Sequence, residues 1–169
     1  MPTCHLPALL ACLAGLPACV VPVGPEWVDP PENYPPTIAE ATPAVGSVLA
    51  PTPDSGGQPA VRVVLADQNT RDNVYFRFII DYPPFDPATS RVAWPSALPG
   101  GDQVKREPIV FVPSCALHDI ASGFSSHRLL LAASDGHFVD DVPGQAGLDK
   151  TLDGRVPVEA MWPFELDCP

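Results

Sequence analysis

Hydrophobic and polar residues alternate with a period of two along much of the chain after residue 36. The clearest stretch covers residues 73–82, where every even-numbered residue is apolar and the odd-numbered ones are polar except Tyr75 and Ile79. Successive side chains on a strand point to opposite faces, so this pattern predicts a half-buried antiparallel β-strand. Residues 156–166 repeat the pattern, and the prolines among them predict a strand at the edge of a sheet.

Further strands are expected where short apolar runs lie between turn residues. The expected segments are residues 38–42, 60–67, 91–94, 109–112 and 129–133. No segment has the period of a twelve-residue helix, and residues 114–122 have room for one helical turn. Seven or so strands in about 130 residues predict an all-β fold, a β-sandwich. The aromatic residues expected in its core are Phe76, Phe78, Trp162 and Phe164.

Three segments of this region resemble immunoglobulin-like modules of the cadherin and fibronectin type III kind. Pro35-Pro36-Thr37-Ile38 resembles the entry to a first strand. Residues 127–136 resemble a late strand that runs into an Asp-Gly turn, and residues 156–166 resemble the closing strand. The resemblance implies a single immunoglobulin-like antiparallel β-sandwich over residues 37–169. It implies a fold more than a function, because such sandwiches carry many unrelated activities.

The N-terminal segment has a different pattern. Residues 1–18 contain no Asp, Glu, Lys or Arg, and residues 6–16 form an apolar stretch. That stretch suits the core of a signal peptide and is too short to span a bilayer, which takes about 20 residues. It ends in Leu16-Pro17-Ala18-Cys19, which resembles the lipobox of bacterial lipoproteins. The resemblance implies a signal peptide over residues 1–18 and acyl chains such as palmitate on Cys19, which would begin the mature chain.

Alternatives for this segment stay open. Cys12 follows Leu9-Leu10-Ala11 and would be the acylated residue after a shorter apolar core. Two further alternatives to a lipoprotein signal are a secretory signal peptide without lipidation and a buried N-terminal helix. Six prolines lie in residues 20–36, and they predict an extended tether, because proline fixes φ and has no amide hydrogen. The expected organisation is therefore a signal peptide (1–18), a lipidated tether (19–36) and one domain (37–169).

Composition and charge narrow the class of partner. The chain of 169 residues has 9 Lys and Arg against 20 Asp and Glu, for a net charge of −11. Contacts to phosphate groups require clusters of Lys and Arg, and the sequence has none. A nucleic-acid partner and electrostatic adhesion to anionic lipid are therefore both disfavoured. The 24 prolines argue against a helical bundle, and the 46% of hydrophobic residues argue against a disordered chain.

The cysteines agree with export. Cys4 and Cys12 would leave with the signal peptide and Cys19 would carry lipid, which leaves Cys115 and Cys168. An even remainder in an exported chain predicts a disulfide, here closing a loop of about 54 residues. Two free buried thiols are the alternative.

Three histidines and several carboxylates are the candidates for a metal site. His118, His127 and His137 have Asp119, Asp135, Asp140 and Asp141 near them in sequence. Imidazole and carboxylate can hold zinc or calcium, and residues 135–141 are where such a site is expected first. Their spacing matches no metal motif, so solvated turn residues are the expected role, with no metal and no cofactor.

Ser125-Ser126-His127 raises the question of a serine nucleophile with a histidine base. Ser126 and His127 are adjacent on an expected strand and point to opposite faces, so they are badly placed to bond. No G-x-S-x-G motif is present. A triad assembled from residues distant in sequence stays open, but we expect no enzymatic activity.

These features together predict a lipid-anchored protein of the bacterial cell envelope. Val20 and Val21 follow Cys19 in place of an acidic residue, which favours the outer membrane. The expected role is structural or adhesive, with an envelope protein or glycan as partner. The alternative is a secreted hydrolase or metal-dependent binding domain that uses His118, His127 and the region from Asp135 to Asp141.

Overall fold

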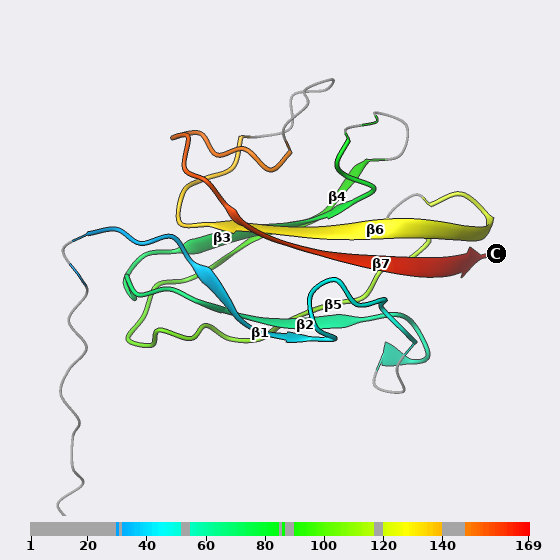
Figure 1. The fold of residues 1–169 in the computed structure, drawn as a ribbon, viewed down its shortest axis with the longest axis horizontal. Helices are drawn as coiled ribbons and strands as arrows, with labels where there is room; N and C mark the ends of the chain where they lie inside the picture. The colour runs from blue at the N-terminus through cyan, green and yellow to red at the C-terminus, as the bar shows by residue number, and fades with distance from the viewer. Residues whose placement is uncertain are drawn as a thin grey trace, which may run out of the picture.

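Two antiparallel β-sheets face each other across one core in the computed structural model (Figure 1). The structure describes residues 30, 32–51, 55–84, 86, 90–116, 120–139 and 148–169. The smaller sheet has the strand order β1-β2-β5 and the larger one the order β4-β3-β6-β7. The predicted all-β sandwich of about seven strands is confirmed.

The strands agree with the expected segments, and two of them are longer. They are β1 (Thr37–Thr42), β2 (Val61–Ala66), β3 (Val74–Ile80), β4 (Arg91–Leu98), β5 (Ile109–Phe111), β6 (Gly123–Ser134) and β7 (Val158–Cys168). Strand β4 continues through Pro95, beyond its expected end at residue 94. Strand β6 begins at Gly123 and not at residue 129, because β7 pairs along its whole length, down to Gly123 opposite Cys168. Pairing with a long partner extends a strand into polar sequence that shows no apolar run.

The core is formed by one face of each strand. The even-numbered residues of β3 and β7 and the odd-numbered ones of β6 point between the sheets, as the alternation predicts. Burying each large apolar side chain contributes about 1.5–3 kcal/mol. Trp162 is fully buried, and its Nε1 donates to the carbonyl oxygens of Pro43 and Ala44, both at 3.1 Å. The four expected aromatic core residues are all buried: Phe76, Phe78, Trp162 and Phe164.

Part of the outer face of the larger sheet, around β3, is buried as well, which differs from the half-buried strand expected at residues 73–82. Ile79 and Leu130 form a second apolar cluster there with Tyr82. Arg77, expected on the solvent face, is 6% exposed and donates to the carbonyl oxygens of Val139 (2.9 Å) and Leu148 (3.2 Å). Segments that are distant in sequence cover this part of the sheet. The alternation within a strand does not predict such a cover.

Strand β7 lies at the edge of its sheet, as its prolines predict. The segment before β2 runs beside it and joins the two sheets. Gly46 N–H donates to the carbonyl oxygen of Met161, and Leu49 N–H donates to that of Pro163, both at 2.9 Å. Pro163 has no N–H to donate, but its carbonyl is paired, so this edge is partly covered.

The predicted disulfide is confirmed. Cys115 and Cys168 are bonded, with their Cα atoms 5.7 Å apart, and Cys168 is part of the core. The bond joins a turn at residues 115–116 to the last residue of β7. The expected helical turn at 114–122 is not formed by the described residues of that segment, which have only this turn at 115–116 and a bend at residue 122. No helix in the described part of the chain is long and apolar enough to cross a membrane.

Candidate functional site

Ser125, His127 and Asp81 form a chain of side-chain hydrogen bonds. Ser125 Oγ lies 2.6 Å from Nε2 of His127. On the other side of the ring, His127 Nδ1 lies 2.8 Å from Oδ2 of Asp81. The hydroxyl and the carboxylate are therefore on different ring nitrogens, which is the connectivity of a serine nucleophile, a histidine base and an aspartate that orients the base.

Strand geometry brings the serine and the histidine together. They are two residues apart on β6, so their side chains share its inner face. Strand β3 ends at Ile80, and Asp81 is the next residue. Beyond this point β6 pairs with β7 alone, which leaves room beside the imidazole for the carboxylate.

Asp81 is held in an unusual backbone conformation. Its φ of 56° makes it the one non-glycine residue with positive φ in the described part of the chain. This left-handed region costs roughly 1–2 kcal/mol for an ordinary residue, and Asp tolerates it better than most. Two bonds to Arg128 hold it there: Asp81 N–H donates to the carbonyl oxygen at 2.9 Å, and Oδ1 accepts from the N–H at 3.1 Å. The carboxylate is thus fixed against β6 independently of the histidine.

Hydrogen-bonding capacity sets the tautomer of His127. An ionised carboxylate only accepts, so Nδ1 carries the hydrogen that bonds to Asp81. In the neutral ring Nε2 is then an acceptor, and the hydroxyl of Ser125 donates to it. The ring packs against Phe164 with centroids 5.3 Å apart, and the His127 side chain is 10% exposed. This environment restricts rotation of the ring away from the serine.

An open hollow of about 610 Å³ adjoins this site. Its lining residues are Asp81, Pro84, Asp86, Ser126, His127, Arg128 and Pro163, and Ser125 is not among them. The Asp81 side chain is 22% exposed and Ser125 is partly exposed. Solvent and small solutes therefore reach the imidazole from a surface that carries charges of both signs.

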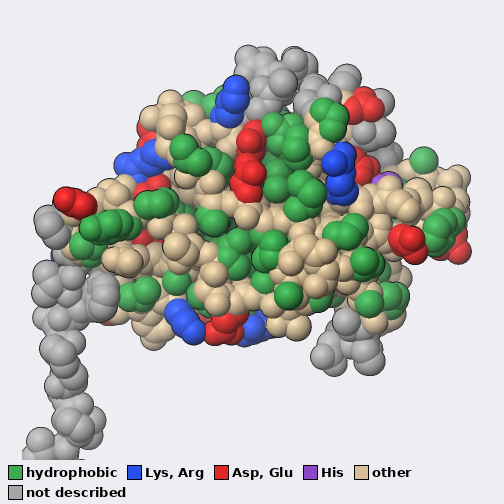
Figure 2. All heavy atoms as spheres, viewed as in Figure 1, with side chains coloured by type: hydrophobic (Ala, Val, Ile, Leu, Met, Phe, Trp, Pro, Cys, Tyr) green, Lys and Arg blue, Asp and Glu red, His purple; other side chains and the backbone are tan. Residues whose placement is uncertain are grey.

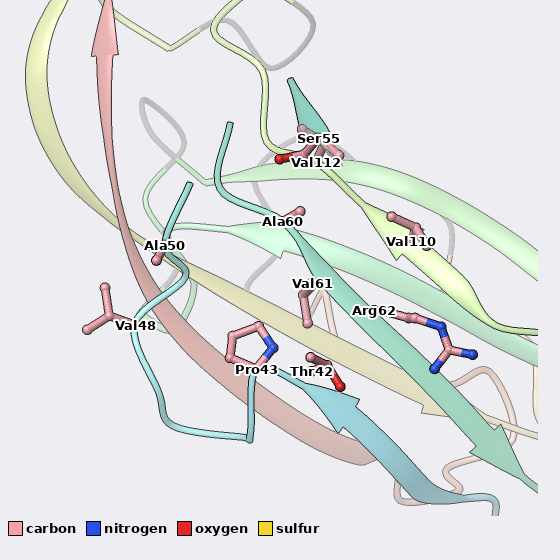
Figure 3. Close-up of a pocket in the computed structure, with 10 residues that line it drawn as sticks. All are labelled: Thr42, Pro43, Val48, Ala50, Ser55, Ala60, Val61, Arg62, Val110 and Val112. Atoms are coloured by element: carbon pink, nitrogen blue, oxygen red, sulfur yellow. The ribbon is translucent and has the colours of Figure 1, made fainter. Parts of the chain in front are cut away.

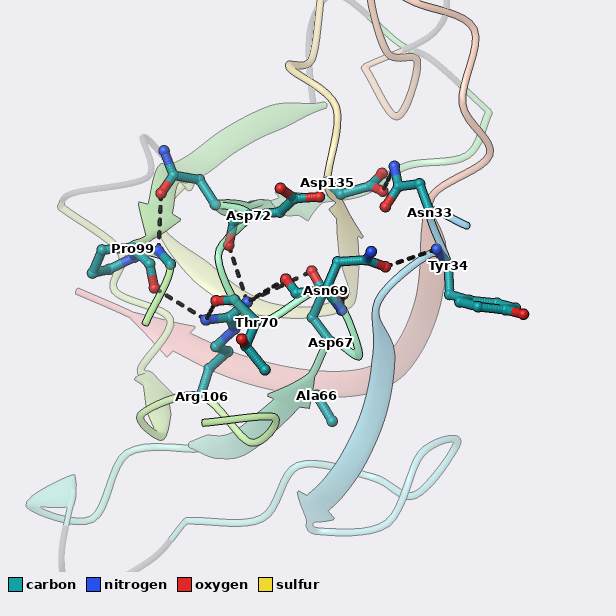
Figure 4. Close-up of polar contacts among 12 residues, drawn as sticks. Asn33, Tyr34, Ala66, Asp67, Asn69, Thr70, Asp72, Pro99, Arg106 and Asp135 are labelled. Atoms are coloured by element: carbon teal, nitrogen blue, oxygen red, sulfur yellow. Dashed lines mark hydrogen bonds and ion pairs between the residues drawn. The ribbon is translucent and has the colours of Figure 1, made fainter. Parts of the chain in front are cut away.

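A second polar cluster lies at the other end of the sandwich, around the guanidinium of Arg106 (Figure 4). Arg106 Nη2 is 3.7 Å from Oδ2 of Asp67, and their side chains are 4% and 0% exposed. Burial raises the pKa of Asp67, and the Asn69 N–H and the Arg106 charge offset only part of that rise. The guanidinium also donates to four backbone carbonyl oxygens, at 2.7–3.3 Å: those of Asn69, Thr70, Asp72 and Pro99.

This Arg106 cluster also fastens the segment that precedes β1. The Asn69 amide donates to the carbonyl oxygen of Glu32 at 3.2 Å and accepts from the N–H of Tyr34 at 2.9 Å. Asn33 donates to Oδ2 of Asp135 at 2.6 Å, and Arg155 pairs with the same oxygen at 2.6 Å. These bonds are structural, because each polar group serves another part of the same chain.

An apolar groove of about 420 Å³ lies on the smaller sheet (Figure 3). Val48, Val110 and Pro43 supply much of its lining, and Arg62 adds a charge. Val48 and Val110 are 62% and 51% exposed. Figure 2 shows further hydrophobic side chains exposed across the middle of the molecule, around β7. The groove has no titratable group other than Arg62, so it offers binding area and no acid–base chemistry.

The structure separates the residues proposed for a metal site. His127 and Asp135 lie near opposite ends of β6, about 26 Å apart along the strand. His137 stacks on Tyr75, with centroids 4.0 Å apart. In the described ranges no group of three or more His, Cys, Asp or Glu could hold a metal ion. Four metal candidates lie outside the described residues: His118, Asp119, Asp140 and Asp141. The two acylation candidates, Cys12 and Cys19, also lie outside them.

The sequence interpretation considered Ser126 and did not consider Ser125. Ser126 is badly placed for His127, as expected, but Ser125 shares its face and bonds to it. The i, i+2 spacing on a strand was a signal available in the sequence. Asp81 had no such signal, because it meets His127 only through the pairing of β3 with β6.

Comparisons with protein-family models, curated proteins and solved structures gave no match to this chain.

Proposed function

We propose that this protein is a lipid-anchored component of the bacterial cell envelope with a structural or adhesive role. The observation that carries the proposal is the bond between Cys115 and Cys168. Structural disulfides persist in oxidising compartments outside the cytoplasm. Such a compartment agrees with the signal-like residues 1–18 and with acylation at Cys19.

The position of the N-terminal segment fits tethered display. Residues 32–34 are bound at the Arg106 end of the sandwich through Asn69 and Asp135. The C-terminus and the disulfide lie at the opposite end (Figure 1). An anchor at Cys19 would therefore hold the molecule by one end, with the other end directed away from the membrane. Because residues 32–34 are bound to the domain, the reach from Cys19 is set by residues 20–31, which span at most roughly 40 Å.

Fractionation of cells that express the full chain tests this proposal. We expect the wild type in the membrane fraction, with an acylated mature N-terminus at Cys19 by mass spectrometry. Cys19→Ala should lose the acyl mass and leave the membrane fraction, while Cys12→Ala, the matched control, should behave as wild type. A wild-type chain that is cut elsewhere and carries no lipid would contradict the anchor.

The same cells test the proposed role. Cross-linking at the envelope should give discrete adducts of the anchored chain with one protein or glycan partner. The same treatment of Cys19→Ala should give fewer adducts, because the tether raises the local concentration at the membrane. Equal adducts from both chains would assign the binding to the domain alone and would contradict a tethering mechanism.

A further inference from the structure

We propose that Ser125 is a nucleophile that attacks carboxylic esters, with His127 as its general base and Asp81 as the residue that positions the base. This activity goes beyond the proposed anchoring role and does not depend on it. The expectation of no enzymatic activity rested on the placement of Ser126 and on the absence of a G-x-S-x-G motif, whereas the geometry concerns Ser125.

All three members of the chain are in place in the unliganded protein. A nucleophile and base must lie within about 2.6–3.2 Å, and the Ser125–His127 contact is 2.6 Å. The base must in turn be oriented by a third group, and Asp81 is 2.8 Å from its far nitrogen. A network that served only to satisfy buried polar atoms would need neither this order nor an exposed member.

The site combines rigidity with access. Phe164 packs on the imidazole, and the backbone of Arg128 fixes the carboxylate through its N–H and carbonyl groups. Ser125 is partly exposed, and its partners His127 and Asp81 line an open hollow. Held geometry lowers the entropic cost of reaction, since the groups need no rearrangement when the ester arrives.

The reaction balances without a cofactor. Ser125 Oγ bonds to the ester carbonyl carbon while its proton passes to His127 Nε2. The bond from that carbon to the alcohol oxygen then breaks, and the alcohol leaves with the proton from Nε2. Water repeats the sequence on the acyl-serine and releases the acid. Asp81 stays ionised throughout and stabilises the imidazolium through Nδ1.

The hollow adjoins the imidazole and the carboxylate but not the nucleophile. Its lining includes Asp81, Asp86, Ser126 and Arg128, and Ser125 is not part of it. The hollow therefore sets no limit on the acyl group, and carboxylic esters as a class are the proposed substrates.

Labelling with a tagged fluorophosphonate, followed by peptide mass spectrometry, tests the nucleophile. The full chain with its disulfide formed is used. We expect label on Ser125 in the wild type, and at least about a hundredfold slower labelling in His127→Gln and Asp81→Asn. Ser125→Ala should not label. Ser126→Ala, the neighbouring serine on the other face, should label like wild type, and so should Cys19→Ala.

Hydrolysis of p-nitrophenyl acetate supplies a second readout in the same variants. We expect Asp81→Asn to lower kcat with little change in KM, since Asp81 does not touch the ester. Intact mass and circular dichroism confirm that each variant is folded. Labelling of wild type no faster than that of Ser125→Ala would overturn the proposal. So would equal labelling of native and urea-unfolded wild type, or label on another residue.

Discussion

The two ends of this sandwich use an aspartate and a nitrogen base in different ways. At the Arg106 end, Asp67 faces a guanidinium that donates hydrogen bonds to four backbone carbonyl oxygens. Both side chains are buried. At the other end, Asp81 faces an imidazole whose second nitrogen meets a serine hydroxyl beside an open hollow. The first arrangement fixes chain segments, and the second leaves a proton acceptor next to a nucleophile.

The comparison shows that side-chain identity alone does not separate a structural ion pair from reactive machinery. Arginine stays charged and has no acceptor, so Arg106 cannot take a proton from a neighbouring hydroxyl. The neutral imidazole has one acceptor nitrogen, and its partner Ser125 is partly exposed. We therefore expect substitutions at the first end to change stability, and those at the second end to change reactivity.

Arg106→Met should have the largest effect on stability. It removes the hydrogen bonds to four backbone carbonyls and leaves Asp67 as an uncompensated buried carboxylate, which costs about 3–5 kcal/mol in comparable pairs. Urea unfolding of wild type and variant measures the difference. Arg62→Met on the exposed surface is the matched control, and its unfolding midpoint should stay within error of wild type. Equal midpoints for both variants would show that the Arg106 end is not structural.

Loss of the disulfide should have the second-largest effect on stability. The disulfide lies at the end of the sandwich opposite to Arg106. Replacing Cys115 and Cys168 by Ala removes the closure of a long loop, worth roughly 4 kcal/mol less any strain in the native bond. Urea unfolding with and without reductant measures it. The intact non-reduced mass of wild type should be two hydrogens light. Full alkylation of both thiols without reductant would rule out the bond.

Asp67 should give the stability a distinctive dependence on pH. Its pKa is raised above the ordinary 3.8 by burial, so the folded protein holds this proton more tightly than the unfolded chain. The contribution of Asp67 is therefore largest at low pH and falls as pH rises from 3.8 through the raised value. Asp67→Asn should remove that part of the slope. An unchanged slope of unfolding free energy between pH 4 and neutral pH would contradict the assignment.

Asp81→Asn should change stability by less than about 1 kcal/mol. Asparagine tolerates φ near 56°, and its amide oxygen still accepts from the Arg128 N–H. The same substitution at Asp67 changes a sealed ion pair, so urea midpoints of the two variants compare the ends directly. A larger loss at Asp81 than at Asp67 would reverse the comparison.

Chelation should have the smallest effect. The Arg106 guanidinium fills the space among the four carbonyl oxygens, so that part of the protein needs no metal ion. The melting temperature should be the same with and without EDTA. A stoichiometric ion in purified protein and a loss of several degrees on chelation would favour the metal-dependent alternative.

The fold was more predictable from sequence than the site. Alternation depends on local sequence, so the faces of β3 and β7 and the edge position of β7 followed from it. The remaining cysteine pair followed from counting. Burial of Arg77 did not, because its cover comes from residues more than sixty positions away.

The candidate site was visible only in part. Ser125 and His127 are local partners, and the two-residue period places them on one face of a strand. The apolar run placed the start of that strand at residue 129, and the immunoglobulin resemblance placed it at residue 127, so Ser125 lay outside it in both cases. Asp81 reaches His127 across 46 positions and through a left-handed backbone, and no pattern in a single sequence encodes that contact.

The protonation state of His127 tests the central contrast most directly. A long-range proton–nitrogen NMR correlation at neutral pH reports which ring nitrogen carries the hydrogen. We predict the Nδ1–H form with Nε2 bare, so that Ser125 donates to the ring. A ring with its hydrogen on Nε2 would make Ser125 an acceptor, and the Ser125 end would then be as unreactive as the Arg106 end.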